Sequence, residues 1–120
     1  MKADTVVIPP PPRFLSLEAK SWWRFYAQAM HARGGVNAAD LGGLAELSEV
    51  AAELTRLRKV IAERGGQTAY EATSVSGEKL WRAYPEVSQV ADASRRLAAL
   101  LNAYGLTPAS RGRVARGDRL

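Results

Sequence analysis

Glycines divide most of this chain into separate segments of helical periodicity. Gly34-Gly35 and Gly65-Gly66 each follow a run in which apolar residues recur every three or four positions, and Gly105 follows a third such run. Glycine readily adopts the left-handed conformation with which many helices end. The pattern therefore predicts three helices, over residues 17–33, 37–64 and 85–104, in place of one continuous helix.

The residues that open each segment agree with these boundaries. Ser16 stands at the N-cap position of the first helix, and Asn37 with Asp40 forms a capping-box variant before the second. Tyr84-Pro85 opens the third helix, because proline is favoured at the first helical position. Signals at both ends of each segment support the same helical assignment.

The segment between the second and third helices does not have the helical period. Residues 67–84 are enriched in Thr, Tyr, Val and Trp around Ser74-Val75-Ser76-Gly77. Such residues flanking a glycine-containing turn predict a small β-hairpin. The predicted fold is therefore mainly α: a helical hairpin plus a third helix with a small β-hairpin.

The chain is organised as one domain between two terminal segments. Its 120 residues, 47% of them apolar, suit a single folded core, which we place at residues 16–105. Residues 1–15 form a lead-in whose four prolines, Pro9 to Pro12, favour an extended, stiff spacer. Residues 106–120 form a basic tail.

The second predicted helix is apolar on two sides. One stripe runs through Leu41, Leu44, Ala51 and Ile61. The second stripe consists of Leu47, Val50, Leu54, Leu57 and Val60. A helix with two apolar sides has to bury both. The second stripe is therefore expected to contact either the third helix or another subunit.

Most of the net charge of +5 lies in the tail. Residues 106–120 contain four arginines and one aspartate, and so contribute +3. Arginine forms forked hydrogen bonds with phosphate, and basic tails are typical of proteins that bind nucleic acid. The tail could instead only aid solubility, without a partner.

Several classes of chemistry are excluded or disfavoured. The chain has no cysteine and one histidine, His31, and its carboxylates lie at ordinary helix-surface spacing, so we expect no metal site, no cofactor and no enzymatic activity. The glycine pairs do not match a phosphate-binding loop. The apolar runs are far shorter than the ~20 residues of a membrane helix, and the N-terminus is unlike a signal peptide. A soluble, cytoplasmic protein is expected.

The order of these features resembles a known family. A Pro-rich lead-in precedes a helix containing Ser21-Trp22-Trp23, and a Gly-Gly turn leads to the helix that starts near Asp40. A hairpin, Tyr84-Pro85 and finally Gly105-Leu106-Thr107-Pro108-Ala109-Ser110-Arg111 follow. Residues 9–114 thus resemble the small terminase subunit of tailed bacteriophages, in the branch with a C-terminal Gly-Leu-Thr-Pro-x-Ser-Arg signature.

The resemblance implies a non-catalytic part of a phage DNA-packaging motor in the host bacterial cytoplasm. Members assemble as rings, bind double-stranded viral DNA and recruit or stimulate the large terminase subunit, which carries the ATPase and nuclease. The implied fold is a helical domain that forms a homo-oligomeric ring. On this chain the second stripe of the long helix would be the subunit interface.

The residues themselves favour DNA contact through phosphates. The second helix begins with small and acidic residues, Ala38 to Gly43, which do not suit reading of bases in the major groove. We therefore assign DNA binding to the arginines of the tail, with a weaker patch on the second helix. The tail residues are Arg111, Arg113, Arg116 and Arg119, and the patch is Arg56, Arg58, Lys59 and Arg64.

Two other functions are compatible with the same sequence. The first two helices, joined by a short glycine turn, could form the helix-turn-helix of a dimeric DNA-binding regulator. Alternatively, a structural adaptor could use the basic tail to dock on an acidic protein surface.

Overall fold

The computed structural model describes residues 8–108 and Ser110. The elements are α1 (Leu17–Arg33), a 3₁₀ turn η1 (Ala38–Asp40), α2 (Leu41–Glu63), β1 (Ala69–Thr73), β2 (Lys79–Ala83) and α3 (Pro85–Ala103). The prediction of a mainly helical protein with a small antiparallel hairpin is confirmed.

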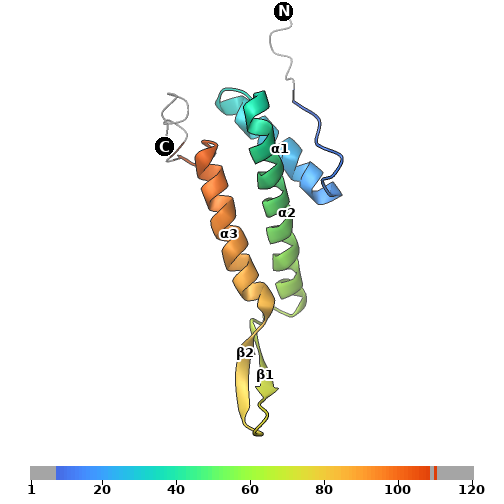
Figure 1. Ribbon diagram of the computed structural model, residues 1–120, viewed down its shortest axis with the longest axis vertical. Helices are drawn as coiled ribbons and strands as arrows, with labels where there is room; N and C mark the ends of the chain where they lie inside the picture. Colours follow the sequence, from blue (N-terminus) through green and yellow to red (C-terminus); the bar gives the residue numbers. More distant parts are fainter. Residues whose placement is uncertain (1–7, 109, 111–120) are drawn as a thin grey trace, which may run out of the picture.

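Helix α2 forms the centre of the arrangement. In Figure 1, α1 crosses α2 obliquely, whereas α3 runs beside α2 in the opposite direction. The hairpin projects beyond the helices at the end where α2 meets α3. Its two strands pair from Ala69 with Ala83 to Thr73 with Lys79. The C-terminal ends of α1 and α3 and the start of α2 therefore gather at the opposite end of the molecule.

Local capping explains where the first two helices begin. Ser16 Oγ accepts a hydrogen bond from Ala19 N at 3.1 Å. Asn37 Oδ1 accepts from Ala39 N at 2.9 Å, and Asp40 Oδ2 accepts from Asn37 N at 3.0 Å. Both caps are those expected from the sequence. The second helix differs in one respect, because its first turn is the 3₁₀ turn η1.

The main core lies between α1 and α2. Trp23, Met30, Leu44 and Leu47 are almost fully buried there. Trp23 also donates a hydrogen bond from Nε1 to the Pro9 carbonyl oxygen, with an N–O distance of 2.8 Å. The described part of the Pro-rich lead-in is therefore fastened to α1 by a buried side chain.

Helix α3 buries a narrower stripe than the sequence indicated. Ala93 is fully buried, and Val90, Leu97 and Leu100 contact the same cluster from α3. The spacing of apolar residues in the sequence predicts a core stripe on this helix that includes Ala91, but Ala91 is exposed. The reason is that α3 packs chiefly along α2, and one neighbouring helix covers only one side of it.

A glycine allows α2 and the C-terminal end of α3 to approach closely. A Cβ atom at Gly43 would overlap the ring and hydroxyl of Tyr104, whereas the neighbouring Gly42 has open space around it. Tyr104 therefore lies directly against the α2 backbone. This contact holds the end of α3 beside the first turns of α2.

Replacement of Gly42 and of Gly43 by alanine should change the free energy of unfolding in opposite directions. Gly43→Ala should lower the free energy of unfolding by about 1–3 kcal/mol, because Tyr104 has to move. Gly42→Ala, the matched control, should raise it by up to about 1 kcal/mol, because alanine is the better helix former. Urea unfolding of both variants at equal protein concentration measures the difference, and equal shifts of the same sign would contradict the packing described.

Candidate nucleic-acid interface

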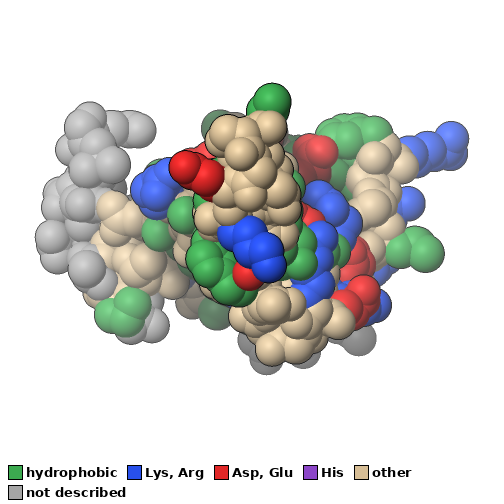
Figure 2. Space-filling view, turned by 90° about the horizontal axis from the view of Figure 1, so that it is seen from below, with side chains coloured by type: hydrophobic (Ala, Val, Ile, Leu, Met, Phe, Trp, Pro, Cys, Tyr) green, Lys and Arg blue, Asp and Glu red, His purple; other side chains and the backbone are tan. Residues whose placement is uncertain are grey.

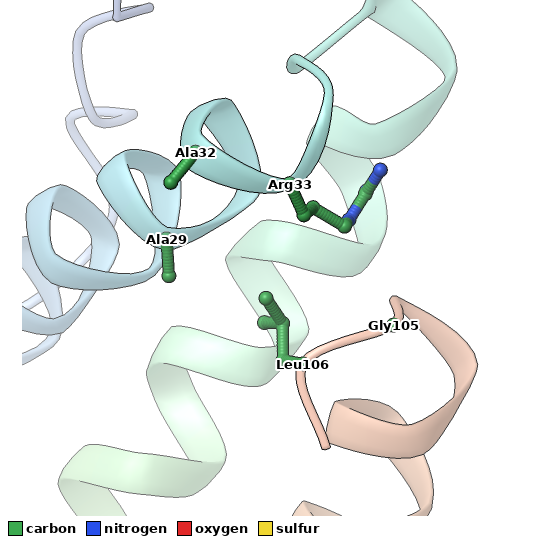
Figure 3. A pocket seen from close by; sticks show the side chains of 5 residues that line it. All are labelled: Ala29, Ala32, Arg33, Gly105 and Leu106. Carbon is green, nitrogen blue, oxygen red and sulfur yellow. The ribbon is translucent and has the colours of Figure 1, made fainter. Parts of the chain in front are cut away.

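The point from which the arginine tail departs lies at the end of the molecule where α1 and α3 finish. Arg111, Arg113, Arg116 and Arg119 are outside the described residues. The chain that leads to them passes through Gly105 and Leu106, directly beside the last turns of α1 (Figure 3). Tail contacts with DNA would therefore begin at this end.

A shallow pocket marks this point. It has a volume of about 280 Å³ and is lined by Ala29, Ala32 and Arg33 of α1 and by Gly105 and Leu106. In Figure 3 the Leu106 side chain points toward α1, while the Arg33 guanidinium extends past the pocket toward the start of α2. The pocket itself is mainly aliphatic, with one cation at its edge.

Arg33 is a basic residue near the tail that the sequence analysis did not select. In the sequence it is one charge in the last turn of a helix, where it complements the helix dipole. Its position beside Gly105 and Leu106 arises from tertiary packing between elements about seventy residues apart along the chain. No local signal in the sequence identifies that proximity.

The predicted patch on α2 does not form one continuous basic surface. Arg56, Arg58 and Lys59 are exposed. Arg56 lines a cleft of about 370 Å³ together with Glu18, Glu49 and Glu53. Those carboxylates offset its charge. Arg58 and Lys59 remain the members of this patch that are exposed and outside the acidic cleft.

Arg64, the fourth member of the patch, is engaged within the fold. Its NH2 atom lies 2.6 Å from Glu86 Oε1 at the start of α3. Its guanidinium carbon lies 4.0 Å from the centre of the Tyr84 ring. These contacts join α2 to the strand–helix junction, so Arg64 serves to hold the hairpin end of the molecule together.

The hydrogen bond between Arg64 and Glu86 shifts the ionisation of both groups. It lowers the pKa of the Glu86 carboxyl below its ordinary value of 4.5, and it raises the pKa of the Arg64 guanidinium. Both shifts favour the charged forms. The pair is therefore ionised at neutral pH.

Among the described residues, the surface seen from the hairpin end carries side chains of both charges. Figure 2 shows Lys and Arg side chains intermixed with Asp and Glu around the projecting hairpin. Glu53 and Arg96, for example, form an ion pair at 3.0 Å between α2 and α3. A surface of mixed charge does not steer DNA strongly.

The second apolar stripe of α2 is largely covered within the chain. Leu47, Val50, Leu54 and Leu57 are at most 2% exposed, and Val60 is half-buried. Helix α1 covers Leu47, and α3 covers the other three with Ala93 and its neighbours. Of the two partners expected for this stripe, the third helix or another subunit, the structure of the single chain therefore shows contact with the third helix.

Several large apolar side chains outside the second stripe of α2 are exposed. Phe14, Leu17 and Phe25 are 72%, 83% and 58% exposed, and they follow the N-terminal half of α1 and the turn before it. We call these three residues the α1 patch. On the hairpin, Trp81 is 67% exposed. Large apolar side chains that are exposed to solvent are candidates for protein–protein contact.

Neither a metal-ligand cluster nor a membrane-spanning helix is found among the residues that the structure describes. No group of three or more His, Asp or Glu side chains among those residues could hold a metal ion. None of the described helices is both long enough and apolar enough to span a membrane.

A comparison with protein-family models decides the relationship. Residues 19–119 match the family described as phage terminase, small subunit. The chain belongs to this family. Searches of curated proteins and of solved structures returned no match. The matched range begins in α1 and includes the tail arginines.

Membership of the phage terminase small-subunit family connects the chain with phage DNA packaging. Terminases act inside the host cell, in a complex that also involves DNA and a large subunit, and small subunits are generally non-catalytic. The helices, the hairpin and the arginine tail described above are thus parts of a packaging protein.

The ion pair at the hairpin end predicts a pH-dependent stability. The folded-state pKa of Glu86 is lowered, so the stabilisation is present above the ordinary carboxyl pKa and is lost as the pH falls through the folded value. Glu86→Gln should therefore melt below the wild type at neutral pH, and the difference should vanish in acid. Thermal melting across pH measures this, and a difference that grows in acid would contradict it.

Proposed function

We propose that this protein is the small terminase subunit of a tailed-phage packaging motor in the host bacterial cytoplasm. It forms a ring, binds double-stranded viral DNA and recruits or stimulates the large subunit, without catalysis of its own. The observation that carries the proposal is the family match over residues 19–119, which joins the helical core to the arginine tail in one unit.

DNA contact is assigned to phosphates and not to bases. Arg111, Arg113, Arg116 and Arg119 supply concentrated positive charge in a segment that follows α3. Arg33 stands beside the start of that segment, and Arg58 with Lys59 adds an exposed minor patch. Contacts of this kind bind and orient DNA without reading its sequence.

The helix-turn-helix alternative has less support from the packing. A recognition helix presents its N-terminal residues to the major groove. Here the first turns of α2 carry Gly43, against which Tyr104 of α3 lies, and the buried Leu44. That end of α2 is used for packing between helices.

The ring contact is assigned to the α1 patch. The second stripe of α2 is already covered within one chain except at the half-buried Val60, so it has little apolar surface left for a neighbour. Phe14, Leu17 and Phe25 do have such surface. A ring joins a patch on one copy to a different surface on the next, which does not require the patch to be self-complementary.

The mass of the protein in solution tests the ring. Light scattering after size exclusion should give a single species many times the 13.0 kDa of one chain. Leu17→Ser with Phe25→Ser should reduce that mass while keeping the helical circular-dichroism spectrum, because both side chains are exposed in the single chain. Val75→Ser, at another exposed apolar position in the hairpin turn, is the control and should leave the mass unchanged. A wild-type monomer or dimer would refute the ring.

The salt dependence of DNA binding tests the role of the tail. Replacing Arg111, Arg113 and Arg116 together by Ala should weaken binding to a short duplex and flatten the plot of log affinity against log salt. The slope changes by about 0.9 for each DNA phosphate that the variant no longer neutralises.

The matched control removes the same number of positive charges from positions outside the tail. Arg13, Arg82 and Arg95 are exposed and lie outside the tail and the α2 patch. Their joint replacement by Ala should change the slope less than the tail variant does. Equal slopes for the wild type and the tail variant would remove the tail from the DNA site.

A further inference from the structure

The junction between α3 and the tail is built from two capping motifs placed directly after one another. The first ends α3, and the second begins a new helical turn, in which Pro108 and Ser110 have helical backbone. Only Leu106 lies between the glycine that closes one motif and the threonine that opens the other. The two capping motifs are therefore joined without a flexible linker between them.

The end of α3 is a complete Schellman motif. Gly105 has a φ of +70°, which favours glycine. Its N–H donates to the Asn102 carbonyl oxygen at 3.2 Å, and the Leu106 N–H donates to the Leu101 carbonyl oxygen at 2.8 Å. Leu106 also packs against the main core cluster. Both the path of the backbone and the apolar contact that accompanies this motif are therefore present.

The start of the next turn is a reciprocal capping box between two hydroxyl side chains. Ser110 N donates to Thr107 Oγ1 at 3.2 Å, and Thr107 N donates to Ser110 Oγ at 3.3 Å. The two hydroxyl oxygens lie 2.6 Å apart. Thr107 Oγ1 is also 3.3 Å from Asn102 Oδ1, in the last turn of α3. Thr107 thus connects the new turn to the helix before it.

These contacts hold the backbone at Thr107 and Ser110 next to the end of α3. Ser110 is fully buried, although it is a polar residue one position before the first arginine of the tail. Pro108, at the first helical position, restricts φ and is preorganised for a helical turn. The end of α3 is itself held against α2 by the contact of Tyr104 with Gly43.

We propose that Thr107 and Ser110 are positioning residues for phosphate binding by the arginine tail. They contact no DNA; they hold the residue before the first arginine, Ser110, next to the end of α3, so that the arginines follow from a fixed point at the end of the molecule where Arg33 lies. This inference rests on the proposed function, because it requires the tail to contact DNA. It goes beyond that function in assigning a task to residues without charge.

The physical reason is preorganisation. A charged segment on a free linker has to be ordered as it binds, and each immobilised side chain and backbone unit opposes association. A segment whose first residues are already directed by two caps loses less conformational freedom. Removing the cap should therefore weaken binding while the charge of the protein stays the same.

The test compares four single variants and one double variant, all full-length, on a short fluorescent DNA duplex, by anisotropy over a series of salt concentrations. Thr107→Val removes the hydroxyl at nearly constant shape, and Ser110→Ala removes its partner. Thr107→Ser keeps a capping hydroxyl. Ser16→Ala is the matched control, because it removes the N-cap hydroxyl of α1, which accepts from Ala19 N at 3.1 Å.

Thr107→Val and Ser110→Ala should each lower DNA affinity about tenfold and flatten the salt slope, by about 0.9 for each DNA phosphate that the tail no longer neutralises. The double variant should resemble either single one, because the two hydroxyls act as a unit. Thr107→Ser should bind as the wild type does. Ser16→Ala should lower the melting temperature with no change in the slope.

Two results would overturn the inference, and they have different meanings. Wild-type slopes in Thr107→Val and Ser110→Ala, together with a flattened slope after replacement of the tail arginines, would refute positioning and leave the tail as the DNA site. Wild-type slopes in the arginine variant as well would refute both the positioning role and the assignment of DNA binding to the tail.

Discussion

The structure depends on one helix that is covered on two sides. Helix α2 carries two apolar stripes, which α1 and α3 cover between them, so neither flanking helix needs extensive contact with the other. Burial of the leucines and valines along α2 supplies the main driving force for both contacts. The oblique crossing of α1, the antiparallel course of α3 and the projecting hairpin all follow from this arrangement (Figure 1).

The same arrangement determines which surfaces are left for partners. Because the second stripe of α2 is largely covered inside the chain, the large apolar side chains that remain exposed lie on α1, in the turn before it and on the hairpin. Because α1 and α3 end beside each other, Arg33 and the start of the tail occupy one end of the molecule. Arg64 secures the other end through Glu86 and Tyr84.

Much of the local structure could be predicted from the sequence. Ser16, Asn37 with Asp40, Pro85 and the glycines act through hydrogen bonds and dihedral preferences within a few residues, so their effects can be read from short stretches. The positions of the tail arginines are likewise a fact of sequence. The partner of the second α2 stripe could not be predicted. The hydrophobic effect is not directional, so an apolar side chain can be buried equally well by the same chain or by another one.

The ends of the helices and of the hairpin, and the concentration of positive charge after α3, can be read from the amino-acid sequence. Those properties depend on near neighbours and on composition. Packing of the whole chain is needed to see that α3 covers most of the second α2 stripe, that Arg64 is engaged in an ion pair while Arg58 and Lys59 are exposed, and that Arg33 lies beside Gly105 and Leu106. Those outcomes depend on which helix faces meet, and residues distant in sequence meet only when the whole chain is packed.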